Sequence, residues 1–124
     1  MDSKDSSECA GGPKLIFACS GAADVGEISD RAARELNKGG IGKMFCLAGV
    51  GGKIAGIIEK TQTASKVLAI DGCELDCAKN CLHHAGFGAF KHFHITDLGM
   101  QKGQAAVSNE NVAKVVQHAT ALLA

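Results

Sequence analysis

KVLAIDGCELDCAKNCLHHAG, residues 66–86, places a short apolar run directly before a stretch with helical spacing. The run 66–72 ends in Asp and Gly, which is typical of a buried strand followed by a turn. In 73–86 the apolar residues recur at intervals of three and four, namely Leu75, Ala78, Leu82 and Ala85, and Gly86 follows the last of them. This pattern predicts a helix over 73–86 with one apolar face, so the whole segment predicts a strand–helix unit.

The same alternation of an apolar run and a helical stretch occurs three more times along the chain. The other predicted strands are KLIFACSG (14–21), GKMFCLAG (42–49) and FKHFHITDLG (90–99). The other predicted helices cover 25–36, 51–64 and 109–123. Gly39-Gly40 stops the first of these helices, and Ser108 is the expected N-cap of the last.

Four strand–helix units of this length predict a parallel sheet with helices on both faces. Because crossovers between parallel strands are right-handed, we expect an α/β fold: a single small Rossmann-like domain of three layers with about four parallel strands. This domain is expected to span residues 14–124. Residues 1–13, MDSKDSSECAGGP, are small and polar and predict a disordered N-terminal tail.

The composition narrows the classes of function. The 124 residues are enough for one domain with its own core, and 13 basic residues balance 13 acidic ones. Nucleic-acid-binding domains usually carry a basic surplus, so no nucleic-acid partner is expected. The chain has neither an apolar run of about 18 residues nor a signal-peptide pattern, so we expect a cytoplasmic protein without a membrane partner. Thiols stay reduced in the cytoplasm, so six cysteines predict metal, redox or sulfur chemistry rather than disulfides.

Three cysteines fall where predicted strands end. Cys19 ends the first strand, Cys46 lies near the end of the second, and Cys73 directly follows the third. The carboxyl ends of parallel strands share one edge of a sheet, where ligands bind, so these thiols are predicted to gather there. Cys77 is predicted one helical turn after Cys73 on the same face, which suits two ligands of one zinc ion better than a disulfide. The helix N-terminus is expected to favour thiolates at this point.

The remaining two cysteines are predicted to lie outside this set. Cys81 would lie two helical turns beyond Cys73, about 12 Å along the axis, too far to share an ion with it. It is closer to the apolar face of that helix, so we expect it to be a packed small residue. Cys9 falls in the predicted tail and is expected to be an exposed thiol without a role.

Four motifs occur in order along most of the chain: CSGAADVGEISDRAAREL, GKMFCLAGVGG, AIDGCELDCAKNCL and TDLGMQKG. Together they resemble the DGC-domain family, small prokaryotic proteins named after a central Asp-Gly-Cys, here Asp71-Gly72-Cys73. The resemblance implies a zinc-binding protein without an established reaction. Matched by motif, the four chelating cysteines that it implies are Cys19, Cys46, Cys73 and Cys77. Cys9, Cys81 and the pair His83–His84 do not match the family pattern.

Two further pairs of polar residues are candidates for the same edge. His92 and His94 alternate with Phe93 in the last predicted strand and therefore share a face. Such a pair can hold a metal, but on an edge strand we expect it to form a half-polar solvent face. Asp71 and Asp97 follow strands and could act as general bases, although their expected role is to cap helices or turns.

The sequence therefore predicts a protein that holds one zinc ion through Cys19, Cys46, Cys73 and Cys77 at the carboxyl edge of its sheet. A closed shell of four thiolates leaves no position for a substrate, which favours a structural, sensing or metal-handling role. Two alternatives stay open: a thiol redox or sulfur-transfer enzyme that uses Cys73 or Cys77, and an iron–sulfur cluster on the same thiolates. A third reading is that the four cysteines are small residues packed against the sheet edge.

Overall fold

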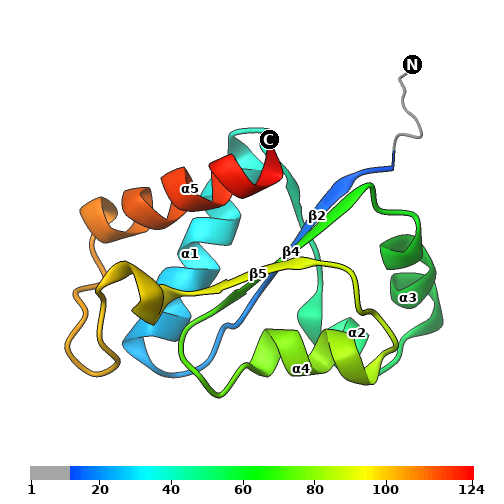
Figure 1. The fold of residues 1–124 in the computed structure, drawn as a ribbon, viewed down its shortest axis with the longest axis horizontal. Helices are drawn as coiled ribbons and strands as arrows, with labels where there is room; N and C mark the ends of the chain where they lie inside the picture. The colour runs from blue at the N-terminus through cyan, green and yellow to red at the C-terminus, as the bar shows by residue number, and fades with distance from the viewer. Residues whose placement is uncertain (1–11) are drawn as a thin grey trace.

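The computed structural model describes residues 12–124, which form one parallel sheet covered by helices (Figure 1). The strand order is β3-β2-β4-β5, so β2 and β4 are central and β3 and β5 are edges. The strands are β2 Lys14–Ala18, β3 Lys43–Met44, β4 Lys66–Asp71 and β5 Lys91–His94. Residues 1–11 lie outside the described part of the chain, and with them Cys9 and most of the predicted tail.

Helices lie on both faces of the sheet, which confirms the predicted three-layer α/β architecture. On one face are α1 Asp24–Lys38 and α5 Asn109–Leu123; on the other are α2 Leu47–Gly51, α3 Ala55–Gln62 and α4 Cys77–His84 (Figure 1). In the part of the chain that the structure describes, no helix is long and apolar enough to cross a membrane.

The central strands supply both cores of the domain. Along β2, Ile16 faces the core under α1 and α5, whereas Leu15 and Phe17 face the core under α2 and α4. All three side chains are fully buried. A strand buried on both faces needs apolar residues at every buried position, which is why LIFA, residues 15–18, is an uninterrupted apolar run.

The two long helices form as the sequence predicts. The predicted stripe of α1, from Val25 to Leu36, is buried, and Gly39 caps the helix before Gly40 adopts a φ of 73°. Ser108 is the N-cap of α5, where its Oγ accepts a hydrogen bond of 3.1 Å from the backbone N–H of Asn111. Fully burying one such Val, Leu or Ile contributes about 1.5–3 kcal/mol, which fixes these helices on the sheet.

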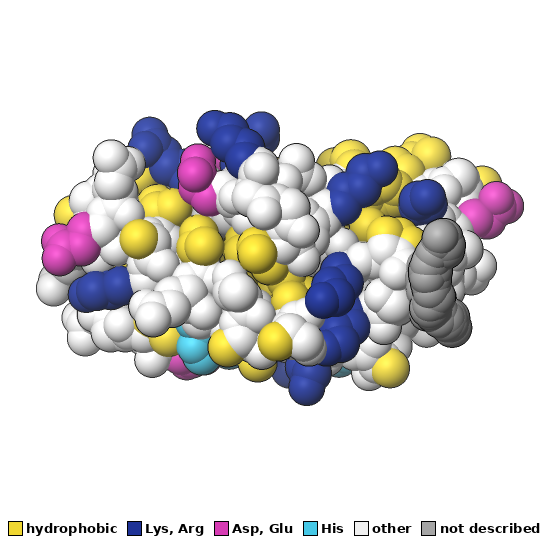
Figure 2. Space-filling view, turned by 90° about the horizontal axis from the view of Figure 1, so that it is seen from above, with side chains coloured by type: hydrophobic (Ala, Val, Ile, Leu, Met, Phe, Trp, Pro, Cys, Tyr) yellow, Lys and Arg dark blue, Asp and Glu magenta, His cyan; other side chains and the backbone are white. Residues whose placement is uncertain are grey.

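The outer surface near α1 and α5 carries mixed charge. Figure 2 shows the molecule of Figure 1 as seen from above, where Lys and Arg side chains are spread among acidic and apolar ones. A hollow of about 700 Å³ is lined by residues of α1 and α5, among them Arg31, Arg34 and Val112. It does not involve the cysteines, so the chemistry of the candidate site lies elsewhere.

All four strands are shorter than the runs predicted from the sequence, most of all those predicted over 42–49 and 90–99. The strand predicted over 42–49 is only Lys43–Met44, because the Cys46 thiol accepts a hydrogen bond from the backbone N–H of Gly49 and begins α2. The strand predicted over 90–99 ends at His94 and passes into the 3₁₀ helix η1, Ile95–Leu98. Asp97 caps the start of η1, because its carboxylate accepts a hydrogen bond of 3.1 Å from the His94 backbone N–H.

The helix predicted over 73–86 begins later, at Cys77. Asp76, its N-cap, has a φ of 58°, and a left-handed residue cannot continue a right-handed helix backwards. Cys73 therefore lies in the turn that precedes α4. Leu75, predicted to face the core, is 64 % exposed, whereas Ala78 and Leu82 are buried as predicted.

Candidate metal centre

Cys19, Cys73 and Cys77 meet at the carboxyl edge of the sheet. Cys19 follows β2, and its N–H donates to the Ile70 carbonyl of β4 at 2.9 Å. Cys73 follows β4 and packs half-buried against the core under α1. Cys77, the first residue of α4, is exposed, and it lies close enough to Cys19 and Cys73 for their charges to affect its pKa. The structure therefore brings these three residues to the same edge of the sheet.

The electrostatics of Cys77 differ from the prediction that the helix N-terminus would favour thiolates. The pKa of Cys77 is raised above its ordinary value, first by burial and then by the negative charges of Cys19, Asp71 and Cys73. Cys77 and Cys73 are also not one turn apart on a helix, because only Cys77 is helical. Burial, and after it the neighbouring acidic groups, thus oppose the ionisation of Cys77.

A positive charge lies beside Cys73 instead. The Nζ of Lys102 is 3.7 Å from the Sγ of Cys73 and donates a hydrogen bond to it. Lys102 comes from TDLGMQKG, the loop between η1 and α5. Nothing in the sequence spacing indicates this contact, because the two residues are 29 positions apart.

Cys46 and Cys81 lie on the α2–α4 side of the same edge. Cys46 is exposed and shares a hollow of about 400 Å³ with Cys81 and with Ala18 and Ser20, the neighbours of Cys19. A second hollow, about 370 Å³, is lined by Cys81 and Cys77. Cys81 was predicted to be too far from Cys73 to share an ion because both were expected on one helix. That expectation is wrong, because Cys73 lies in the turn before α4. Cys81 is half-buried, belongs to neither core, and lies between Cys46 and Cys77.

Asp71, the last residue of β4, caps α4. Its carboxylate is 1 % exposed and accepts hydrogen bonds from the N–H groups of Ala78 at 2.7 Å and Lys79 at 3.1 Å. The Nε2 of His92 lies 2.8 Å from the same carboxylate. The capping role predicted for Asp71 is confirmed, and so is the one predicted for Asp97.

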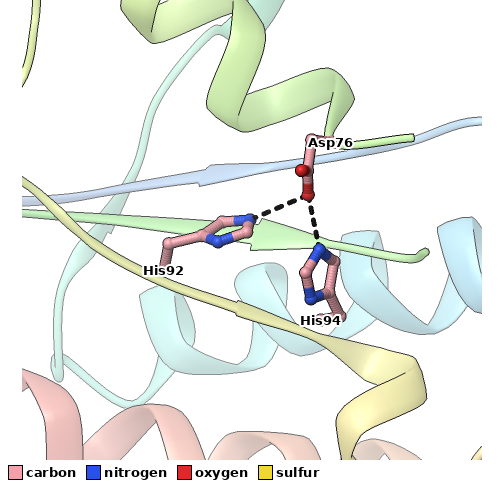
Figure 3. A group of neighbouring side chains, drawn as sticks. All are labelled: Asp76, His92 and His94. Carbon is pink, nitrogen blue, oxygen red and sulfur yellow. Dashed lines mark hydrogen bonds and ion pairs between the residues drawn. The ribbon is translucent and has the colours of Figure 1, made fainter. Parts of the chain in front are cut away.

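Asp76, His92 and His94 form a compact group that sequence reasoning missed (Figure 3). Among the described residues, they are the set of three whose ligand atoms all lie within 4.8 Å of one another. The Nε2 of His92 is 3.6 Å from Asp76 Oδ1, and the Nε2 of His94 contacts that oxygen directly. The side chains of His92 and His94 are only 16 % and 23 % exposed, so they do not form the predicted solvent face.

Hydrogen bonds fix the orientation of the His94 ring. Its Nδ1 lies 3.1 Å from Asp97 Oδ2, so the ring is held between Asp97 and Asp76. Burial alone would lower the pKa of His94, but the hydrogen bonds to Asp76 and Asp97 raise it above its ordinary value. The sequence signal for this group was the pair His92 and His94 together with the aspartates of the segment 71–76. Only the pairing of β5 with β4 brings the histidines close to that segment.

Residues 15–119 match the DGC domain family. The chain belongs to this family. It is also 32 % identical over 88 residues to the anaerobic and virulence modulator AnvM of Pseudomonas aeruginosa, a match that covers 71 % of this chain and 67 % of that protein. No solved structure gives a significant match to the chain.

The three residues that name the DGC domain have different physical roles here. Asp71 caps α4, as described above. Gly72 lets the turn pass α1, because a β-carbon there would lie 2.9 Å from Val25 Cγ2. Cys73 supplies a thiol at the sheet edge. In this DGC domain the motif therefore builds the turn that carries the candidate ligands.

Proposed function

We propose that this DGC domain binds one zinc ion through Cys19, Cys46, Cys73 and Cys77, in a structural, sensing or metal-handling role. The observation that carries the proposal is the meeting of Cys19, Cys73 and Cys77, from separate segments, at one edge of the sheet. Thiolates crowded in a half-buried place repel one another, and a cation relieves that repulsion. Thiolate sulfur is also a preferred ligand of zinc.

The donor set fits zinc in its chemistry and requires the thiols to close around the ion. The four cysteines do not place three sulfurs within 4.8 Å of one another, whereas two sulfurs on one tetrahedral zinc lie about 4 Å apart. Cys46 is exposed at the N-cap of α2, and Cys73 lies in the turn 73–76, outside any helix or strand. Bound zinc would supply a positive charge that ties β2, β4 and α2 together.

The proposal is tested by the metal content of protein purified under reducing conditions without added metal. Serine replacements of Cys19, Cys46, Cys73 and Cys77 should each lower bound zinc by one equivalent. The matched control is Cys81→Ser, which makes the same chemical change on α4 one turn from Cys77. Zinc that survives Cys46→Ser and is lost in Cys81→Ser would assign the fourth ligand to Cys81. Iron with acid-labile sulfide and a brown colour would replace the zinc proposal with an iron–sulfur cluster.

A second candidate function is thiol–disulfide exchange at Cys73, because the Lys102 ammonium lies 3.7 Å from its sulfur. The Cys73 sulfur, as its thiolate, would attack a disulfide sulfur, form a mixed disulfide and release the other sulfur as a thiolate. Rapid exchange of metal-free wild type with a small disulfide, together with a lower exchange rate in Lys102→Met, would favour this function over metal binding. The matched control is the exposed Lys38→Met.

A further inference from the structure

We propose that Asp76, His92 and His94 form a second, separate site for a divalent first-row transition metal ion such as Zn²⁺ or Co²⁺. The three side chains come from two elements: both histidines from β5 and the aspartate from the N-cap of α4. His92 and His94 are two residues apart on one strand, so their rings lie on the same face, with centroids 4.8 Å apart. Figure 3 shows both rings directed at the Asp76 carboxylate.

The spacing of the ligand atoms suits a small ion. Two ligands on a tetrahedral zinc with bonds of about 2.0–2.2 Å lie about 3.3–3.6 Å apart. His92 Nε2 and Asp76 Oδ1 are already 3.6 Å apart, and all three ligand atoms lie within 4.8 Å. For an ion to enter, the direct contact between His94 and Asp76 has to open, and His92 Nε2 has to leave Asp71 Oδ2. Two imidazoles and one carboxylate are a ligand set that zinc, iron and cobalt accept.

A carboxylate behind one ring orients it in the way that metal-binding histidines require. His94 Nδ1 lies 3.1 Å from Asp97 Oδ2, and the same oxygen accepts the His94 backbone N–H. A histidine whose Nδ1–H donates to a carboxylate presents its Nε2 lone pair to the metal. That Nε2 is the atom directed at Asp76.

The second ring has a different carboxylate partner, which metal binding would exchange for the ion. His92 Nε2 lies 2.8 Å from Asp71 Oδ2 and 3.6 Å from Asp76 Oδ1. Asp71 keeps its two backbone partners on α4 when the ring turns toward an ion. The exchange of one partner for another therefore leaves no buried carboxylate without hydrogen bonds.

The charge around the rings favours a cation. Three carboxylates, those of Asp71, Asp76 and Asp97, surround two imidazoles, so at least one negative charge remains in excess even when both rings are protonated. Lys79 lies near Asp76 and offsets part of this charge, but an ammonium cannot ligate a metal. Three protein ligands leave a position open for water, unlike the closed set of four thiolates.

Cobalt distinguishes this site from the thiol site, because thiolate-bound Co²⁺ adds near-ultraviolet charge-transfer bands to the visible bands that imidazole and carboxylate ligands also give. Co²⁺ titrated into reduced, metal-free wild type should bind Asp76, His92 and His94 with visible bands and shift the imidazole NMR signals of both histidines. Asp76→Asn and His94→Ala should each lose this one equivalent and leave any charge-transfer bands unchanged. The matched control, exposed His83→Ala, should bind Co²⁺ as wild type does. Asp97→Asn should weaken binding about 10- to 100-fold.

Each outcome decides the proposal. Asn tolerates the left-handed conformation of Asp76, so Asp76→Asn tests the site even where His94→Ala fails to fold. Unchanged stoichiometry in Asp76→Asn together with unshifted histidine signals in wild type would overturn the proposal. So would charge-transfer bands that disappear with Asp76, because the cluster would then serve the thiol site. Histidine shifts without any charge-transfer bands would support this site and contradict the zinc site on the cysteines.

Discussion

Gly72 lies where the turn after β4 passes closest to the first turn of α1. A β-carbon at this position would lie 2.9 Å from Val25 Cγ2, 3.0 Å from the Val25 carbonyl carbon and 3.1 Å from Gly26 N. Two of these atoms belong to the backbone of a helix and cannot turn aside as a side chain can. The absence of a side chain at Gly72 thus sets how closely α1 approaches the turn that carries Cys73.

Gly72→Ala should therefore lower the free energy of unfolding by about 1–3 kcal/mol, the usual cost of overpacking. Gly56→Ala is the matched control, because a β-carbon there meets no atom within 4 Å and lies in α3. The same chemical change should stabilise the protein by about 0.5–1 kcal/mol at Gly56. Urea unfolding measures both. Equal effects in the two variants would contradict the close approach described here.

Cys81 shows which residue roles the sequence could not supply. Its exclusion depended on a helix that included Cys73, and that helix begins four residues later, at Cys77. The left-handed conformation of Asp76 decides this start, and a single aspartate in a sequence carries no signal of its φ angle. The gathering of Cys19 and Cys73 at one sheet edge was predictable from their places after apolar runs, but the neighbours of each thiol were not.

At the scale of elements, long amphipathic helices were predictable and short elements were not. α5 runs over 109–123 as predicted, because a stripe of buried residues and the Ser108 cap both mark it locally. β3 has two residues, and its end depends on the Cys46 thiol accepting the Gly49 N–H. A single side-chain cap of this kind decides where an element of only a few residues ends, and the apolar pattern does not show it.

Asp24 connects α1 to the loop that precedes α5, a contact that no pattern in the sequence indicates. Its Oδ1 accepts the N–H of Gly103 at 3.0 Å, and its Oδ2 accepts that of Ala105 at 3.0 Å. The first turn of α1 thereby holds the loop that leads to α5. These hydrogen bonds, first from Gly103 and then from Ala105, lower the pKa of Asp24 below its ordinary value of 3.8.

A lowered pKa in the folded state means that Asp24 stabilises the protein above about pH 4, and that this contribution is lost as the pH falls through the folded pKa. Between pH 6 and pH 3, Asp24→Asn should therefore lose less stability than wild type. The control Glu74→Gln changes an exposed carboxylate and should follow wild type. Urea unfolding across this pH range measures the difference. Parallel pH profiles of stability for Asp24→Asn and wild type would show that the hydrogen bonds of Asp24 to the loop do not contribute to stability.

At the scale of the whole molecule, the parallel topology places two kinds of donor at one edge of the sheet. β2 and β4 deliver Cys19 and Cys73, while the pairing of Asp71 with His94 brings β5 to the turn before α4. The sequence predicts the first group, because thiols after apolar runs share the carboxyl edge in any parallel sheet. It does not predict the second, because the contact of Asp76 with His94 depends on which strand pairs with β4 and in which register.

Ligands drawn from separate strands make metal binding a source of stability for the whole domain. An ion bound only by the folded state stabilises it by about 2.7 kcal/mol when its free concentration is 100 times the dissociation constant. For a domain of this size, that corresponds to a rise in melting temperature of about 10 °C.

A chelator should therefore lower the melting temperature of zinc-loaded protein by about this amount, and Cys46→Ser should do the same without a chelator. Addition of chelator should then lower the melting temperature of Cys46→Ser by less than that of wild type, whereas Cys81→Ser should respond as wild type does. A melting temperature that stays unchanged after complete removal of zinc would contradict a structural role for the ion.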